Sequence, residues 1–292
     1  MLAWIVGGET ESEPEVRLVN AAGKTVAFAR AFAAPSLLES QTSPLAAPGE
    51  EHATVLPRAT LFGALFALPA DVPPGEYRLV AAGASAEIGV EARSFPLETI
   101  KLNQANTELR TVPTPRKTQE ARRLYAVLDG VDEAAVFAVP TGFVFPVAGG
   151  RQSAGFGDRR RYVYSDGSAE GSVHAGIDWA VVAGTPVLAC ARGKVVLAAN
   201  REVTGNTVVI EHLPGLYSLY FHLSSIGVAE GAVVDQGQVI ARSGSTGMAT
   251  GPHLHWELRA AGDAVDPEYW LRSPLLDKAA LTAIIYGQIE GR

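Results

Sequence analysis

The chain has 292 residues, of which 47% are hydrophobic and 19% are charged, and its formal net charge is −7 at pH 7. This length and composition predict a globular protein of two domains, each large enough to bury an apolar core. The negative balance without a long charged run argues against a nucleic-acid partner or an anionic membrane partner. No apolar run in the sequence approaches the ~20 residues of a membrane-spanning helix.

Residues 1–97 contain short apolar runs separated by turn residues, a pattern typical of a small antiparallel β-sandwich. The runs lie at residues 16–19, 25–29, 60–66, 77–81 and 86–90. The turn Pro73-Pro-Gly-Glu-Tyr77 resembles the start of a late strand in bacterial immunoglobulin-like domains. We therefore predict an immunoglobulin-like β-sandwich in residues 1–97. It holds no cluster of catalytic residue types, so its expected role is that of a spacer, an anchor or a lid.

Residues 98–137 are predicted to be a linker that contains one helix. The prolines in Thr111-Val-Pro-Thr-Pro-Arg116 interrupt the chain, and residues 117–128 then place apolar side chains at helical spacing. We expect this helix to dock on one of the two domains. A DNA-contacting helix is the alternative, but its basic residues are interleaved with acidic ones.

Residues 138–275 are predicted to form the second domain, an open or barrel-like antiparallel sheet, so the expected fold is mainly β. The expected strands are residues 185–188, 193–198, 206–211, 216–222, 239–242 and 253–258. The single cysteine, Cys190, lies in an apolar run and is predicted to be a small buried hydrophobic residue. Residues 276–292 are a predicted tail ending in Ile289-Glu-Gly-Arg292, which looks like a protease site left by cloning.

Four of the six histidines lie in three short segments. These segments are His174-Ala-Gly-Ile-Asp178, Tyr220-Phe-His222-Leu and Gly251-Pro-His253-Leu-His255-Trp-Glu257. A hydrolytic zinc site uses three nitrogen or oxygen ligands from the protein and leaves a fourth position for water. His174 and Asp178 share a face of a strand or a helix, and the surrounding residues favour the strand. His253, His255 and Glu257 share one face of a strand, so the sequence predicts a zinc site with catalytic histidines beside it.

Four other residues have more than one possible role. Glu257 either orients a ligand imidazole from behind or is a solvated strand residue. Tyr220 shares a strand face with His222 and is as consistent with packing as with function. His52 and His212 lie outside any metal-like spacing and are predicted to be surface or satisfied core histidines.

The three segments and their order resemble the lysostaphin-type zinc endopeptidases of the bacterial cell wall, whose pattern is H-x-x-x-D, then Y-x-H-L, then G-P-H-x-H. The resemblance covers about residues 142–258. It implies that His174, Asp178 and His255 bind Zn²⁺ and that His222 and His253 are the catalytic pair beside it. One histidine would take a proton from the attacking water and the other would steady the oxyanion, with the assignment between them open.

The resemblance implies a zinc metalloendopeptidase that hydrolyses peptide bonds of peptidoglycan cross-links or stem peptides. The closing Gly-Pro-His-Leu-His-Trp-Glu resembles D,D-endopeptidases of Gram-negative bacteria more than glycyl-glycine-cleaving enzymes. The alternative is a regulatory or binding module of the cell wall whose metal site is not catalytically productive. Residues 231–240 also resemble lipoyl and biotinyl carrier domains, but they lack the lysine that carriers modify.

A cell-wall enzyme acts in the periplasm or outside the cell, so we expect that an export signal or a lipid anchor has been removed from the N-terminus. The starting residues 1–8 support this expectation because they lack the basic region of a signal peptide. Membrane anchoring through that removed segment remains open, and the sequence leaves the oligomeric state open.

Two polar segments carry further predictions. One arginine of Arg159-Arg-Arg161 is a candidate to bind a carboxylate of the stem peptide, against the alternative of a solvated basic turn. Residues 102–107 are predicted to be a polar loop, from which Asn103 or Asn106 could occupy the open position of zinc and silence the enzyme. Residues before about Thr111 are expected to regulate or target the enzyme and not to catalyse.

Overall fold

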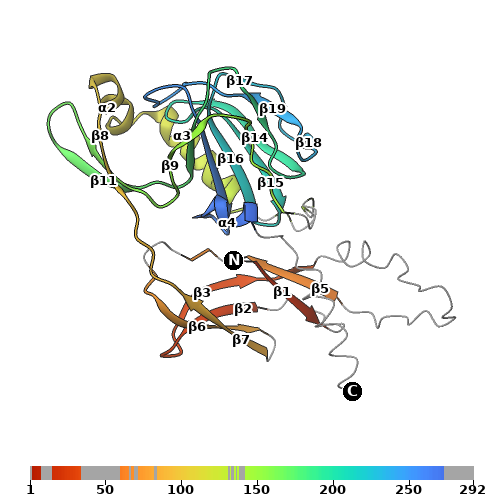
Figure 1. Ribbon diagram of the computed structural model, residues 1–292. Coiled ribbons are helices and arrows are strands. Elements are labelled where there is room, and N and C mark those ends of the chain that lie inside the picture. The colour runs from red at the N-terminus through yellow and green to blue at the C-terminus, as the bar shows by residue number, and fades with distance from the viewer. Residues whose placement is uncertain are drawn as a thin grey trace. The chain divides into compact units, whose positions relative to one another are not determined.

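The computed structural model describes residues 2–7, 15–33, 60–65, 67–68, 72–81, 84–130, 132, 135, 137 and 142–272. The chain divides into two compact units, unit 1 with residues 1–66, 73–91 and 275–292, and unit 2 with residues 67–72 and 92–274. The secondary structure of the described residues is mainly β, as predicted (Figure 1). Unit 2 also includes the strand and helices of the predicted linker, and the predicted domain limits remain predictions.

The described residues of unit 1 form two antiparallel sheets. One has the order β3 (Thr25–Arg30), β2 (Glu15–Asn20), β6 (Gly75–Ala81) and β7 (Ala84–Val90), and the other has the order β1 (Leu2–Gly7), β5 (Thr60–Leu65) and β4 (Phe32–Ala33). In β2 the side chains alternate between buried and exposed, as expected for a sheet with one solvated face. Val16 of β2 and Ala64 of β5 belong to one buried cluster, so the two sheets pack together. The five apolar runs predicted in this region correspond to β2, β3, β5, β6 and β7, with Phe66 at the end of one run outside the described residues.

The largest sheet of unit 2 is antiparallel and open, with β18 and β9 as its edges among the described residues. Its order is β18 (Val233–Val234), β14 (Gly193–Arg201), β15 (Gly205–Leu213), β16 (Leu216–Leu223), β20 (Leu254–Ala260), β12 (Ile177–Ala180) and β9 (Arg151–Ala154), and β21 (Asp263–Val265) pairs with β20. A smaller sheet joins β13 (Pro186–Leu188), β19 (Val239–Arg242) and β17 (Ser225–Ile226). Each predicted strand of this region corresponds to a strand of the structure, but β13 begins at Pro186 and not at Thr185, and β20 begins at Leu254 and not at His253.

The predicted linker helix is α3 (Pro115–Leu128), which packs on the large sheet (Figure 1). Thr114 caps its start by accepting a hydrogen bond from the Lys117 N–H, and Pro115 occupies the first turn, where its missing N–H costs nothing. Leu128 is buried against the sheet. This contact confirms the expected docking of the helix on the second domain. Two arginines of the helix are paired with acidic side chains, such as Arg123 with Glu230 at 2.6 Å, so the DNA-contacting alternative loses support.

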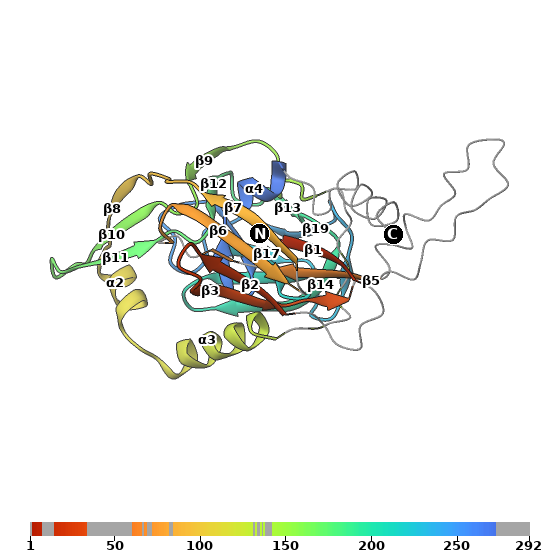
Figure 2. The same cartoon turned by 90° about the horizontal axis from the view of Figure 1, so that it is seen from below.

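Beside the large sheet, two distant parts of the chain combine into what we call the strand–helix lobe, residues 97–111 and 159–173. It contains β8 (Leu97–Lys101), α2 (Gln104–Thr111), β10 (Arg159–Val163) and β11 (Ala169–Val173), and Figure 2 shows its three strands side by side with α2 next to them. The prediction of a polar loop at residues 102–107 was wrong, because Asn103 caps α2 by accepting the N–H of Asn106 at 2.8 Å.

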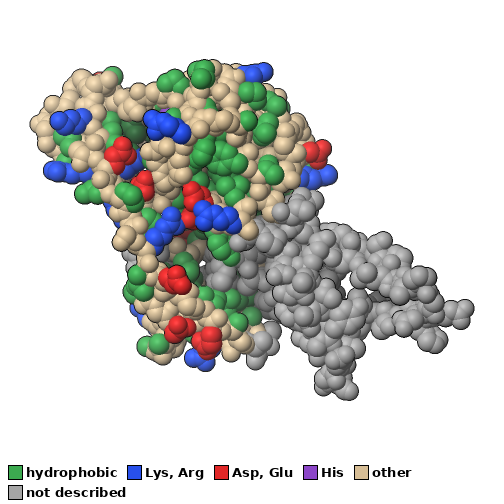
Figure 3. Space-filling view, in the orientation of Figure 1, with side chains coloured by type: hydrophobic (Ala, Val, Ile, Leu, Met, Phe, Trp, Pro, Cys, Tyr) green, Lys and Arg blue, Asp and Glu red, His purple; other side chains and the backbone are tan. Residues whose placement is uncertain are grey.

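Two further facts bear on partners. No helix among the described residues is both long and apolar enough to cross a membrane. On the face seen in Figure 3, basic and acidic side chains are interspersed. The short helix α4 (Pro267–Arg272), which the sequence analysis did not predict, follows β21.

Candidate metal centre

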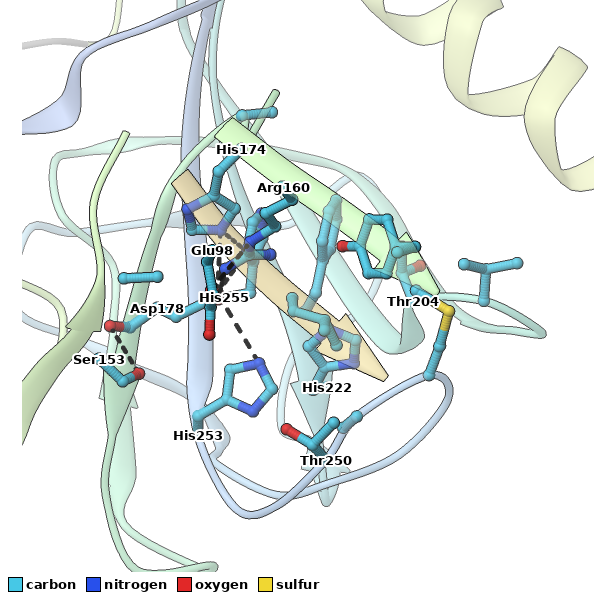
Figure 4. A pocket seen from close by; sticks show the side chains of 18 of the residues that line it. Glu98, Ser153, Arg160, His174, Asp178, Thr204, His222, Thr250, His253 and His255 are labelled. Atoms are coloured by element: carbon cyan, nitrogen blue, oxygen red, sulfur yellow. Dashed lines mark hydrogen bonds and ion pairs between the residues drawn. The ribbon is translucent and has the colours of Figure 1, made fainter. Parts of the chain in front are cut away.

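The structure brings His174, Asp178 and His255 together, with one possible ligand atom from each lying within 4.8 Å of the others. His174 directly follows β11, Asp178 lies on β12 and His255 lies on β20. Strands β12 and β20 pair antiparallel with Asp178 directly opposite His255, which places their side chains on the same face. Figure 4 shows the three side chains directed towards one another.

Gly176 allows the segment between His174 and Asp178 to run close to β20. A Cβ atom at this position would lie 2.3 Å from the carbonyl oxygen of Trp256. Any larger residue would therefore push β12 away from β20 and separate Asp178 from His255.

The hydrogen bonds of the two imidazoles decide which nitrogen atoms face the centre. The Nδ1–H of His174 donates to the Gly155 carbonyl at 2.7 Å, and the Nε2–H of His255 donates to Oε1 of Glu257 at 2.8 Å. Nε2 of His174 and Nδ1 of His255 therefore remain to face each other, 3.1 Å apart. Glu257 is 4% exposed and also accepts a hydrogen bond from Arg259 at 2.7 Å, so it orients the ring of His255 and is not a solvated strand residue.

The donor atoms fit a zinc ion. Oδ1 of Asp178 lies 3.2 Å from Nε2 of His174 and 2.6 Å from Nδ1 of His255. Ligand atoms at about 2.0–2.1 Å from a tetrahedral ion lie roughly 3.3 Å from one another. The distances from Nε2 of His174 to Nδ1 of His255 and to Oδ1 of Asp178 are close to this value. The shorter distance between Asp178 and His255 is that of a hydrogen bond. All three atoms are electron-pair donors directed at one point. They therefore bind a cation better than they hydrogen-bond to one another.

Zinc affinity is expected to rise with pH by about tenfold per unit between about pH 6 and 8. Burial lowers the pKa of His255. The nearby carboxylates of Asp178 and Glu257 have the larger, opposite effect and raise this pKa to about 9. Below that pKa the metal-free protein carries a proton on Nδ1, and a bound ion must displace it. Competition with a chromophoric chelator at several pH values measures the slope, and an affinity that does not change with pH would contradict this account.

His222 and His253 lie beside this group, with their ring centroids 4.7 Å apart. The Nδ1–H of His222 donates to the Thr246 carbonyl at 2.8 Å, and that of His253 donates to the Gly251 carbonyl at 2.9 Å. In the neutral form of each ring Nε2 is therefore the free acceptor, and that of His253 lies 3.8 Å from Oδ1 of Asp178. Each ring can therefore accept a proton close to the predicted zinc position.

The surroundings of His222 keep it neutral and hold its backbone in an unusual conformation. Burial and the nearby His253 and His255 lower the pKa of His222 to about 3. Its φ angle is +59°, in the left-handed region, which costs a non-glycine residue about 1 kcal/mol or more and is found often at functional sites. The backbone N–H of His222 donates to the Thr204 carbonyl at 2.9 Å and helps to hold this conformation.

The remaining predicted residues lie apart from the centre. Tyr220 is fully buried, and its hydroxyl accepts hydrogen bonds from the Cys190 N–H at 2.9 Å and from Ser218 at 3.0 Å, so it is a packing residue. Cys190 is fully buried, as predicted. His212 is a satisfied core histidine, as predicted, whose Nδ1–H donates to the Arg192 carbonyl at 2.8 Å. His52 lies outside the described residues.

A cavity of about 340 Å³ opens over the centre, and one of its walls comes from the strand–helix lobe. Most of this wall, including Glu98 and Ile100, was not predicted from the sequence, because these residues are far from the histidine motifs in the chain. Asn106 lines the cavity, whereas Asn103 caps α2. Silencing by an asparagine stays a prediction.

The three consecutive arginines point to different surroundings. Arg160 donates to Oδ2 of Asp178 at 2.5 Å, Arg159 lies over the ring of Phe95 and Arg161 is exposed. Binding of a substrate carboxylate by one of them also stays a prediction.

Comparisons with known proteins place this centre in a family. Residues 172–267 match the model of Peptidase family M23. The chain is 46% identical over 115 residues to the DD-carboxypeptidase/endopeptidase Mpg of Neisseria meningitidis, covering 38% of this chain and 26% of the relative. It is 46% identical over 93 residues to the peptidoglycan DD-endopeptidase ShyA of Vibrio cholerae, covering 32% of this chain and 22% of the relative. This chain thus spans about a quarter of the length of these relatives.

A solved structure agrees in fold. A crystal structure of a candidate M23 peptidase from Pseudomonas aeruginosa matches with a TM-score of 0.57 and 24% identity, covering 92% of each chain. The matched residues 172–267 include His174, Asp178, His222, His253 and His255. The chain therefore contains a domain of Peptidase family M23.

Proposed function

We propose that this protein is a zinc metalloendopeptidase that hydrolyses peptide bonds of peptidoglycan, with His174, Asp178 and His255 as metal ligands. The observation that carries the proposal is the convergence of two imidazole nitrogens and a carboxylate oxygen in the wall of a cavity, beside the two further imidazoles of His222 and His253. The names of the relatives support the substrate class, since Mpg and ShyA are both named for cleavage of D,D bonds.

The roles of the protein groups follow from their hydrogen bonds. When bound, zinc would lower the pKa of a water molecule towards about 7 and polarise the scissile carbonyl. Glu257 keeps Nδ1 of His255 directed at the centre by accepting the proton on the opposite nitrogen. Nε2 of His222 or His253 would accept a proton from the attacking water, and the other ring, whose Nδ1 proton is held by a backbone carbonyl, would take a second proton from solvent on Nε2 and then donate it to the oxyanion.

The finer assignments also belong to this proposal. We favour a D,D-endopeptidase over a glycyl-glycine-cleaving enzyme, because the closing motif at residues 251–257 resembles the former and both relatives carry D,D activity in their names. We infer a location in the periplasm or outside the cell, where peptidoglycan is accessible. For unit 1 we propose an immunoglobulin-like sandwich with a spacing or targeting role, supported by its two packed antiparallel sheets.

Digestion of purified muropeptides tests the proposal. Cross-linked dimers should be converted to monomers, and the product masses identify the bond that is cleaved. Treatment with a chelator should abolish the conversion, and added zinc should restore it, because the ligands bind the ion that activates water. Magnesium, which prefers oxygen ligands, serves as the control and should not restore activity. Conversion that persists in fully metal-free protein would contradict the proposal, and zinc binding without any conversion would favour the regulatory or binding module.

A further inference from the structure

Arg160 connects the strand–helix lobe to the candidate metal centre. Its Nη2 donates to Oδ2 of Asp178 at 2.5 Å, and the two side chains are only 12% and 13% exposed. Its Nε lies 3.8 Å from Oε2 of Glu98, and among the described residues this buried Nε has no hydrogen-bond partner. The guanidinium therefore has its close hydrogen bond to Asp178 and a looser ion pair to Glu98 (Figure 4).

The two oxygen atoms of Asp178 have separate partners. Oδ1 faces His174 and His255, whereas Oδ2 accepts the hydrogen bond from Arg160. Both sides of the carboxylate are thus held, which fixes its rotation about the bond to Cβ. Without Arg160 the largely buried Oδ2 would lose its charged partner and Oδ1 could turn away from the imidazoles.

The lobe holds Arg160 in place. In the parallel pairing of β8 with β10, Arg160 lies opposite Glu98. Helix α2 is attached to the turn between β10 and β11, because Oγ1 of Thr107 accepts the Ser165 N–H at 3.0 Å. The guanidinium of Arg110 lies over the ring of Tyr162, 4.1 Å from its centre. Strand β10, which carries Arg160, also pairs with β8 along one edge and with β11 along the other.

We propose that Arg160 is a positioning residue that holds Asp178 in the orientation needed to bind the metal ion. This inference rests on the proposed function, and it extends the metal site to the strand–helix lobe, most of which lies outside residues 172–267. Groups that hydrogen-bond a metal ligand typically change metal affinity by about 10–100-fold when they are removed. The charge of Arg160 acts in the opposite sense, since a cation near the site repels the metal ion. The sign of the change therefore distinguishes positioning from simple repulsion.

The test is the zinc affinity of the full chain, measured by competition with a chromophoric chelator. Arg160→Gln should bind zinc about 10–100-fold more weakly than the unchanged protein. Arg160→Lys keeps the charge but not the planar fork, so a smaller loss of about 3–10-fold is expected. Glu98→Gln should change affinity by less than about threefold, because Glu98 is half exposed and 3.8 Å away. Arg161→Gln is the matched control on the same strand and should leave the affinity unchanged.

Melting temperatures of the metal-free variants separate positioning from general stability. Unchanged or tighter zinc binding by Arg160→Gln would overturn the proposal, even if that variant melted at a lower temperature. A larger loss in Glu98→Gln than in Arg160→Gln would overturn it as well. If Arg160→Gln does not fold, Arg160→Lys decides, and full affinity in that variant would count against positioning. Failure of the unchanged protein to bind zinc would refute the proposed function itself, and this inference with it.

Discussion

Removal of either His222 or His253 is expected to reduce turnover by about 10²–10⁴, the range for a lost acid–base or oxyanion group, while zinc stays bound. Both rings are anchored through Nδ1 to backbone carbonyls and not to the three ligand side chains. Their loss therefore removes a proton acceptor from the cavity without opening the metal site. The measurements are the turnover number on muropeptide dimers and the zinc content of each purified variant.

The backbone of His222 requires a second substitution. Alanine at a φ of +59° is strained, so His222→Ala could lose activity through local distortion. Asparagine tolerates this conformation better but cannot replace the imidazole as a base. His222→Asn should therefore show the same loss of turnover as His222→Ala. Near-normal turnover of the His222 and His253 variants with full zinc occupancy would leave the metal site in place and refute the mechanism.

Loss of a ligand should have a different signature. In His255→Ala and His174→Ala, zinc content, melting temperature and activity are all expected to fall together, because metal binding and stability of the folded state are linked. Activity should be lost almost completely, since the site then offers two ligands where a hydrolytic zinc site uses three. Metal analysis, thermal unfolding with and without zinc, and muropeptide digestion measure the three quantities.

Tyr220→Phe is the control for these ligand variants. Tyr220 belongs to the same motif as His222, but its hydroxyl is used in the buried contacts with Cys190 and Ser218. The Tyr220→Phe variant should bind as much zinc as the unchanged protein. Its free energy of unfolding can still fall by about 1–3 kcal/mol, because a buried hydroxyl is lost. Full zinc content in His255→Ala would show that this residue is not a ligand.

Most of the β-structure was predictable because its signals are local. The apolar runs of unit 1 and of the large sheet follow the strand pattern, and glycines separate many of them. The helix at residues 115–128 was predictable from prolines before an apolar stripe at helical spacing. Helix α2 was not, because its residues are mostly polar and it is stabilised by its Asn103 cap and by contacts with a distant hairpin.

The grouping of His174, Asp178 and His255 could be predicted because the order of the motifs resembled a known family. The expectation that His174 and Asp178 share one strand was wrong, since His174 follows β11 and β12 begins only at Ile177. The sequence also indicated Glu257 as a neighbour of His255, but its role became clear only from its burial and its hydrogen bond. Which ring nitrogens face the centre was likewise a question of tertiary hydrogen bonds, such as that from His174 to the Gly155 carbonyl.

The sequence by itself determined the mainly β fold, because periodicity and turn residues act over a few positions, and the resemblance of its histidine motifs to a known family indicated the residues of the candidate centre. Only the tertiary structure decided that Arg160 holds Asp178 and that Glu98 and Asn106 line the cavity. These contacts depend on β8 pairing with β10 across some 60 residues of chain, as in Glu98 opposite Arg160. Pairing over such a separation leaves no periodic signal in either strand, since it is selected by packing and backbone hydrogen bonds that exist only in the folded protein.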